Sequence, residues 1–136
     1  MTIAHVRSNR PRLAAVVIAA ALGVFSATAA QAQVAQGFLG AWAASWQTDR
    51  KAYEATMIVT PSGGTWQTFT RDRNNPCAGK EVPMKIETST DADLQLLLQF
   101  SEVLAGCQNV TVTLRLAPDG TVSGTRSKFE LKLSRK

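Results

Sequence analysis

From residue 38 onward, the chain is a succession of short segments in which apolar and polar residues alternate. Alternation with a period of two is the pattern of a β-strand that has one buried face and one exposed face. The clearest case is 109–116, where Val and Leu alternate with Thr and Arg. Residues 61–64 (Pro-Ser-Gly-Gly) and 118–120 (Pro-Asp-Gly) are typical of tight turns between such strands. The pattern therefore predicts an all-β fold.

Eight segments of this kind follow one another, and most are joined by short turns. They span 38–46, 53–60, 65–71, 82–87, 94–100, 109–116, 121–126 and 129–135. A meander of eight antiparallel strands removes its exposed edges most economically by closing on itself. We therefore expect an eight-stranded antiparallel up-and-down barrel, with an open β-sandwich as the alternative. Residues 33–37 are small and polar, and we expect them to form a frayed end.

The segment 94–104 is compatible with two structures. As a strand, it places Leu94, Leu96, Leu98 and Phe100 on one face. As a helix, it would begin at Asp91, form a stripe of leucines and end at Gly106. The glutamines alternate with the leucines and the neighbouring segments are all strands, so we favour the strand, followed by a turn or a short helical piece.

The first 32 residues have the composition of an export signal. A basic region with Arg7, Arg10 and Arg12 precedes an apolar run at 13–27, and Ala30-Gln31-Ala32 has the small-residue pattern of a cleavage site. Cleavage after Ala30 and retention as a membrane anchor are the alternatives. We expect residues 1–32 to be removed, and residues 33–136 to form one domain without a membrane span, in the periplasm or secreted.

Removal of this segment changes the charge and the chemistry of the chain. Of 15 Lys+Arg and 10 Asp+Glu, only three arginines leave, so the remaining 104 residues carry a net charge of +2. This value gives no reason to expect nucleic-acid binding. The only histidine, His5, also leaves, and the acidic residues are scattered over turns and outer faces. We therefore expect no catalytic residues, no metal and no cofactor, and predict that the protein is not an enzyme.

Two cysteines remain in the mature chain, Cys77 and Cys107. Export places them in an oxidising compartment, where a pair of cysteines in a small domain usually forms a disulfide. Their spacing does not fit a Cys-x-x-Cys redox pair, and a zinc site would need further ligands that the mature chain lacks. We predict one disulfide between them.

The segment Gly40-Ala41-Trp42 and the hairpin at 55–66 resemble the first strands of the calycin group, that is, lipocalins and avidins. Gly40 permits close approach of the backbone where strands bend or cross. The resemblance implies a barrel whose bottom is closed at Trp42. It also implies that a basic residue late in the chain packs across Trp42, with Arg135 favoured over Arg126. A ligand cup would then open at the other end. Avidins carry a polar residue soon after the Trp, whereas alanines follow Trp42 here, so biotin is not predicted.

Two groups of residues are candidates for binding. Trp46, Tyr53 and Trp66 could line the ligand cup, although ordinary core packing would also account for them. The loop at 71–80 contains Arg71, Arg73 and Asn75, which could contact a polar or anionic group, or could simply be solvated.

We therefore expect a protein that binds a small apolar or amphipathic molecule. The alternative is a protein-binding module, such as an inhibitor of an exogenous protease or lysozyme, that acts through its loops. The oligomeric state is left open.

Overall fold

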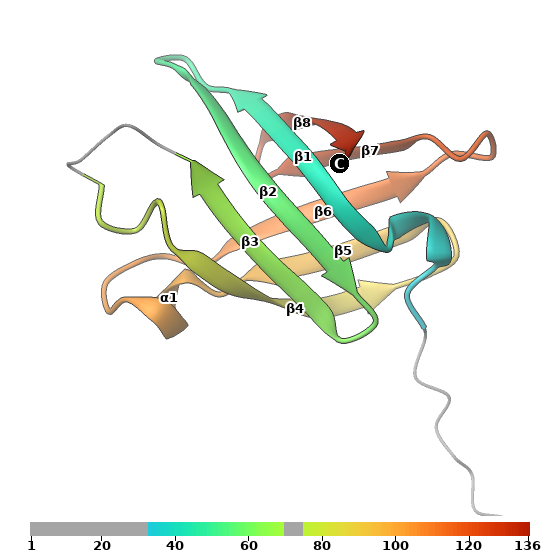
Figure 1. The fold of residues 1–136 in the computed structure, drawn as a ribbon, viewed down its shortest axis with the longest axis horizontal. Helices are drawn as coiled ribbons and strands as arrows, with labels where there is room; N and C mark the ends of the chain where they lie inside the picture. The colour runs from blue at the N-terminus through green and yellow to red at the C-terminus, as the bar shows by residue number, and fades with distance from the viewer. Residues whose placement is uncertain (1–32, 70–74) are drawn as a thin grey trace, which may run out of the picture. The chain divides into compact units, whose positions relative to one another are not determined.

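The computed structural model describes residues 33–69 and 75–136. Eight strands within these ranges form a closed antiparallel barrel in which each strand pairs with its neighbours in sequence and β8 pairs with β1 (Figure 1). The strands are β1 (Gly40–Gln47), β2 (Ala52–Thr60), β3 (Gly63–Phe69), β4 (Glu81–Ser89), β5 (Asp93–Leu98), β6 (Val110–Leu116), β7 (Val122–Arg126) and β8 (Phe129–Arg135). The predicted barrel is confirmed and the open sandwich is not. The expected signal segment lies outside the described residues.

The uncertain segment 94–104 is a strand followed by a short helix, as favoured from the alternating pattern. Residues Asp93–Leu98 form β5, and Phe100–Val103 form the single helical turn α1. Leu94, Leu96 and Leu98 are fully buried, whereas the intervening residues are half-buried. The segment forms a strand and not a helix because β5 pairs on both sides, with β4 and with β6.

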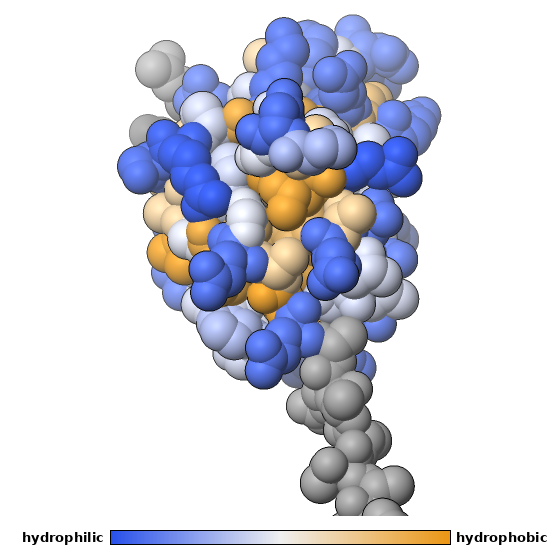
Figure 2. All heavy atoms as spheres, turned by 90° about the vertical axis from the view of Figure 1, so that its right-hand side faces the viewer, coloured by the Kyte–Doolittle hydropathy of each residue, from blue (hydrophilic) through white to orange (hydrophobic). Residues whose placement is uncertain are grey.

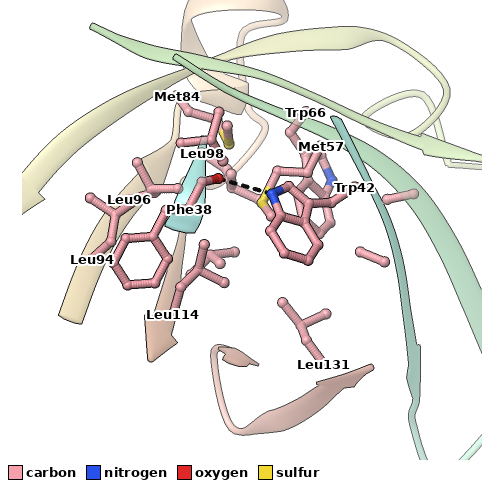
Figure 3. Packing of buried hydrophobic residues seen from close by; sticks show 14 of the residues in the cluster. Phe38, Trp42, Met57, Trp66, Met84, Leu94, Leu96, Leu98, Leu114 and Leu131 are labelled. Carbon is pink, nitrogen blue, oxygen red and sulfur yellow. Dashed lines mark hydrogen bonds between the residues drawn. The ribbon is translucent and has the colours of Figure 1, made fainter. Parts of the chain in front are cut away.

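Large side chains fill the interior of the barrel (Figure 3). Those with no exposed surface include Met57, Trp66, Leu94, Leu96, Leu98, Val112 and Leu114. On β3, the two aromatic residues lie on opposite faces, because Trp66 is fully buried and Phe69 is 49% exposed. The alternation read in the sequence thus separates the core from the outer surface, as expected for strands that bury one face.

One end of the barrel is closed by the segment that precedes β1. Residues Gln36–Phe38 form a 3-10 helix, η1, and Phe38 is fully buried beside Leu94 and Leu114 (Figure 3). The indole Nε1 of Trp42 donates a hydrogen bond to the carbonyl oxygen of Phe38 at 2.9 Å. Figure 2 faces this end and shows apolar atoms ringed by polar ones.

The expectation of a frayed end at 33–37, and of a first strand beginning at residue 38, was wrong. Val34 is only 7% exposed, and Ser89 Oγ donates a hydrogen bond to the carbonyl oxygen of Gln33 at 3.2 Å. The strand begins at Gly40. The physical reason is that a barrel end lined by leucines exposes apolar surface unless an apolar side chain covers it.

Arg135 packs across Trp42 at this closed end. Its guanidinium carbon lies 4.0 Å from the centroid of the Trp42 ring, and the guanidinium donates hydrogen bonds to the carbonyl oxygens of Leu39 and Gly37. Gly40 has a φ of +112°, and a Cβ there would lie 3.0 Å from Arg135 Nη1. Glycine at position 40 therefore serves both the backbone conformation and the approach of the arginine.

We expect Arg135→Met to lower the free energy of unfolding by about 1–2 kcal/mol, because it removes a cation–π contact and charge-assisted hydrogen bonds to two backbone carbonyls. Urea denaturation followed by circular dichroism measures the change. The matched control is Arg115→Met, which breaks only an exposed ion pair with Asp93 (3.1 Å between Nε and Oδ1) and is expected to change stability by less than about 1 kcal/mol. Equal losses in the two variants would contradict a structural role for Arg135.

At the opposite end the strands splay apart. The β1–β8 ladder stops at the pair Ser45 and Lys132, although β1 continues to Gln47. The β3–β4 ladder stops at Gln67 and Glu81, although β3 continues to Phe69. In Figure 1, this end lies on the left, where α1 is seen, and η1 lies on the right. The splayed strands leave room for a cavity.

Candidate functional site

A cavity of about 200 Å³ opens at the splayed end of the barrel, and we call it the cup. Its wall comes from β1, β2, β3, β6 and β7. Its rim comes from α1, the residues that follow α1, and residues 75–78 between β3 and β4. The lining residues on which the chemistry depends are Trp46, Tyr53, Thr68, Phe100, Gln108 and Arg126. Within the described residues, the cup thus combines aromatic rings, neutral polar groups and one cation.

The aromatic part of the cup is a stack built on adjacent strands. Trp46 of β1 and Tyr53 of β2 are register partners, and their rings lie 5.2 Å apart between centroids with an angle of 8° between planes. Trp66 lies against Trp46 at 5.7 Å and 43°. Because Trp66 has no exposed surface, it supports Trp46 from beneath rather than lining the cup.

Thr68 is the buried polar side chain within the described residues. Its hydroxyl oxygen accepts a hydrogen bond from Trp66 Nε1 at 2.8 Å, so the indole N–H of the buried Trp66 is satisfied. A threonine hydroxyl can accept and donate at the same time. Its own hydrogen therefore remains available on the side of the cup.

Arg126, the last residue of β7, brings a positive charge into the cup. Its guanidinium carbon lies 4.7 Å from the centroid of the Trp46 ring and 6.0 Å from that of Trp66. Its Nε is buried and has no hydrogen-bond partner in the part of the chain that the structure describes. Burial lowers the pKa of Arg126 from the ordinary value of arginine, and the electrostatic influence of Tyr53 partly opposes this shift.

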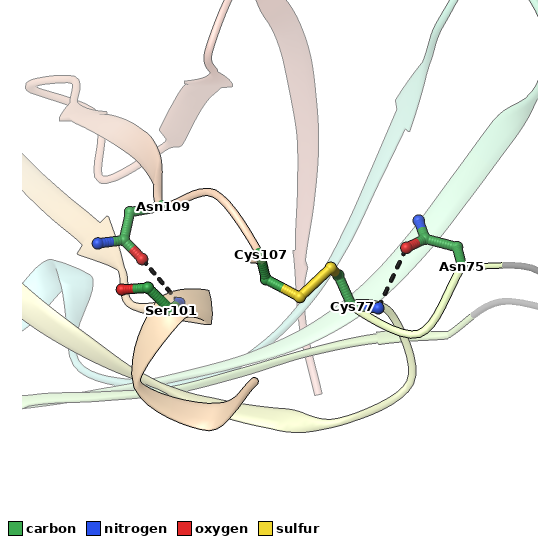
Figure 4. The surroundings of a disulfide bond; sticks show 5 residues. All are labelled: Asn75, Cys77, Ser101, Cys107 and Asn109. Atoms are coloured by element: carbon green, nitrogen blue, oxygen red, sulfur yellow. Dashed lines mark hydrogen bonds between the residues drawn. A yellow bond between two sulfur atoms is a disulfide. The ribbon is translucent and has the colours of Figure 1, made fainter. Parts of the chain in front are cut away.

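A disulfide holds the rim of the cup (Figure 4). Cys77 and Cys107 are bonded with 5.7 Å between their Cα atoms, which confirms the predicted pairing. Asn75 Oδ1 accepts a hydrogen bond from the backbone N–H of Cys77 at 3.1 Å, and Asn109 Oδ1 accepts one from the backbone N–H of Ser101 at 3.0 Å. The bond joins two connections that are distant in sequence.

The structure brings together part of the predicted set. Trp46, Tyr53 and Asn75 line the cup, and Trp66 lies beneath it. Arg71 and Arg73 lie outside the described residues. Arg126 was assigned from the sequence only as an alternative to Arg135 for the contact with Trp42, and it lies instead at the opposite end of the barrel.

One sequence signal could have placed Arg126 in the cup. In β7, Val122 is buried, and Gly124 and Arg126 follow it with a period of two, so Arg126 occupies an inward position at the end of a strand. An inward arginine is unusual in a barrel core. Gln108 has no comparable signal, because it follows α1 in an irregular segment.

Fold and site together define a closed eight-stranded antiparallel barrel. Phe38 closes one end, and the cup at the other end contains a cation. Comparison of the chain with protein-family models, with curated proteins and with solved structures finds no significant match. Among the described residues, the only α-helix is far too short to cross a membrane. A barrel of this kind hosts many activities, so the function depends on the residues of the cup.

Proposed function

We propose that this protein is an exported, non-enzymatic binding protein of calycin-like architecture that takes a small amphipathic molecule into its cup. The observation that carries the proposal is the composition of the cup. Aromatic rings of Trp46, Tyr53 and Phe100 offer apolar contact, and Arg126, Thr68 and Gln108 offer polar contact on the same cavity. Small-molecule sites commonly combine apolar walls with a few polar groups that fix orientation.

The layout of the barrel supports the calycin-like part of the proposal. Arg135 covers Trp42 at the closed end, and the cup opens at the other end, as the resemblance through Gly40-Ala41-Trp42 implies. The disulfide is compatible with export to an oxidising compartment.

The size of the cup restricts the ligand. Drug-sized ligands usually occupy cavities of roughly 300–1,000 Å³, and the cup is smaller, at about 200 Å³. The barrel below it is filled by side chains such as Trp66, Met57 and Leu98. We therefore expect a ligand of about the size of one ring with a polar substituent, or the terminal group of a longer molecule.

Binding is favoured over catalysis by the residue types present. Among the described residues, the lining of the cup includes no acidic side chain and no histidine, and the thiol of Cys77 is consumed by the disulfide. Arg126 and Tyr53 can orient a ligand. An arginine, however, is not a general base, because it keeps its proton at all ordinary pH values.

A second candidate function is a protein-binding module or hydrolase inhibitor that acts through the rim. The observation in its favour is that the barrel interior is filled, while the disulfide holds the rim between Cys77 and Cys107. A rim held in one conformation loses less entropy when it meets a partner.

Native mass spectrometry of the oxidised protein, purified from the export compartment of its own host, tests the proposal. We expect an extra mass that disappears on denaturation. The variant Gln108→Trp is expected to lose this mass, because a larger side chain at an exposed rim position obstructs the cup. The matched control is Thr113→Trp, on the exposed outer face of β6, which should retain it. A bare mass for the unmodified protein would contradict ligand binding and would favour the second candidate.

A further inference from the structure

Arg126 is a partly buried cation that has no anionic partner among the described residues. Its Nε makes no hydrogen bond, and it forms no ion pair within residues 33–69 and 75–136, where Arg115 and Asp93 pair at the outer surface. Its guanidinium instead rests against the rings of Trp46 and Trp66. A buried charge is costly unless an opposite charge or hydrogen bonds compensate it. The aromatic contacts supply only part of that compensation.

The other polar groups of the cup can also bind an anion. The Thr68 hydroxyl accepts one hydrogen bond from Trp66 and keeps its own hydrogen, which it can donate to an anion. Gln108 and Tyr53 also line the cup, and each carries a group that can donate. An anion would receive hydrogen bonds from these groups and from Arg126, whereas a cation would meet the positive charge of Arg126.

The shape of the cup suits a flat body beside this anion. Trp46 and Tyr53 present nearly parallel rings, and Phe100 lines the cup as well. The planar guanidinium of arginine matches a carboxylate in geometry, since two parallel N–H groups can face two oxygens.

We propose that the cup selects a small aromatic carboxylate, with Arg126 as its charge partner and the Trp46–Tyr53 pair as the surface for its ring. This inference rests on the proposed function, because it names the ligand class of the same cup. It differs from the proposed function in the charge it requires of the ligand.

Benzoate and benzamide are suitable probes, because they have nearly the same size and shape and differ in charge. Two-dimensional NMR titrations at pH 7 of the oxidised protein would follow the side-chain Nε–H signal of Arg126. We expect benzoate to shift this signal and to bind at least about tenfold more tightly than benzamide, since a charge-assisted pair is much stronger than a neutral hydrogen bond.

Three variants test the role of Arg126. Arg126→Gln should weaken benzoate binding by at least about tenfold and abolish the preference over benzamide. Arg126→Lys keeps the charge without the planar fork and should recover part of the affinity. Lys128→Gln is the matched control, because it makes the same change in net charge two residues away at an exposed turn position, and its affinity for benzoate should stay within about twofold of the original.

Equal affinity of the unmodified protein for benzoate and benzamide, or an unchanged benzoate affinity in Arg126→Gln, would overturn the inference. So would the absence of binding by both probes. None of these results touches the proposed function, which stands if the native mass spectrum of the host protein contains a ligand and fails if it does not. If Arg126→Gln does not fold, the inference is still tested on the unmodified protein, by the shift of the Arg126 signal and by the comparison of the two probes.

Discussion

Replacing Phe38 by alanine is expected to lower the free energy of unfolding by about 4 kcal/mol, because a large buried side chain is removed and a cavity remains. Phe38 is fully buried and lies among the leucines at the closed end of the barrel. The hydrogen bond from Trp42 Nε1 reaches the backbone carbonyl of residue 38, so it remains possible in the variant. The loss therefore measures packing alone.

Urea denaturation followed by circular dichroism checks this value. The matched control is Phe69→Ala, which removes the same atoms from a side chain that is 49% exposed on the outer face of β3. We expect that control to lose less than about 1 kcal/mol, since less apolar surface returns to water. Similar losses in the two variants would mean that the buried side chain of Phe38 does not stabilise the closed end of the barrel.

Removing the disulfide with the double variant Cys77→Ala and Cys107→Ala is expected to lower the free energy of unfolding by about 3.5 kcal/mol. The bond closes a loop with a sequence separation of 30 residues, and the unfolded chain gains freedom when it is cut. For a domain of about 100 residues, this loss corresponds to a decrease in melting temperature of roughly 15–25 °C.

The unmodified protein in the presence of reductant is the control for this experiment. If the cross-link itself is responsible, the reduced protein and the double variant should have the same free energy of unfolding. A double variant as stable as the oxidised protein would contradict the prediction. Because Cys77 also lines the cup, the same variant should bind a ligand more weakly, since the rim must then be ordered on binding.

The strands could be predicted from the sequence because their pattern is local. Leu94, Leu96 and Leu98 alternate with less buried residues, and the same holds for Val112 and Leu114 in β6. Each pattern needs only a few neighbouring residues to reveal which side chains face inward. The closure into a barrel followed from the number of strands and the shortness of their turns.

The burial of Val34 and Phe38 at the closed end could not be predicted from a local pattern. Phe38 and Val34 belong to an irregular segment without periodicity, and their burial depends on a barrel end formed by distant strands. Residues 33–37 were therefore predicted as a frayed end and Phe38 as the start of a strand, although the leucines of β5 and β6 require a cover.

The amino-acid sequence by itself determined the all-β fold, the up-and-down order of the strands and the pairing of Cys77 with Cys107. It also contains the aromatic residues Trp46 and Tyr53, whose rings stack in the cup. Only the tertiary structure showed that Phe38 closes one end of the barrel and that Arg126 packs against Trp46 and Trp66 at the other. β7 and β8 run in opposite directions, so Arg126 and Arg135 lie at opposite ends, one in the cup and one across Trp42. The period-two pattern of β7 points Arg126 inward, but its contact with rings on β1 and β3 depends on the closure of the barrel, which no local pattern contains.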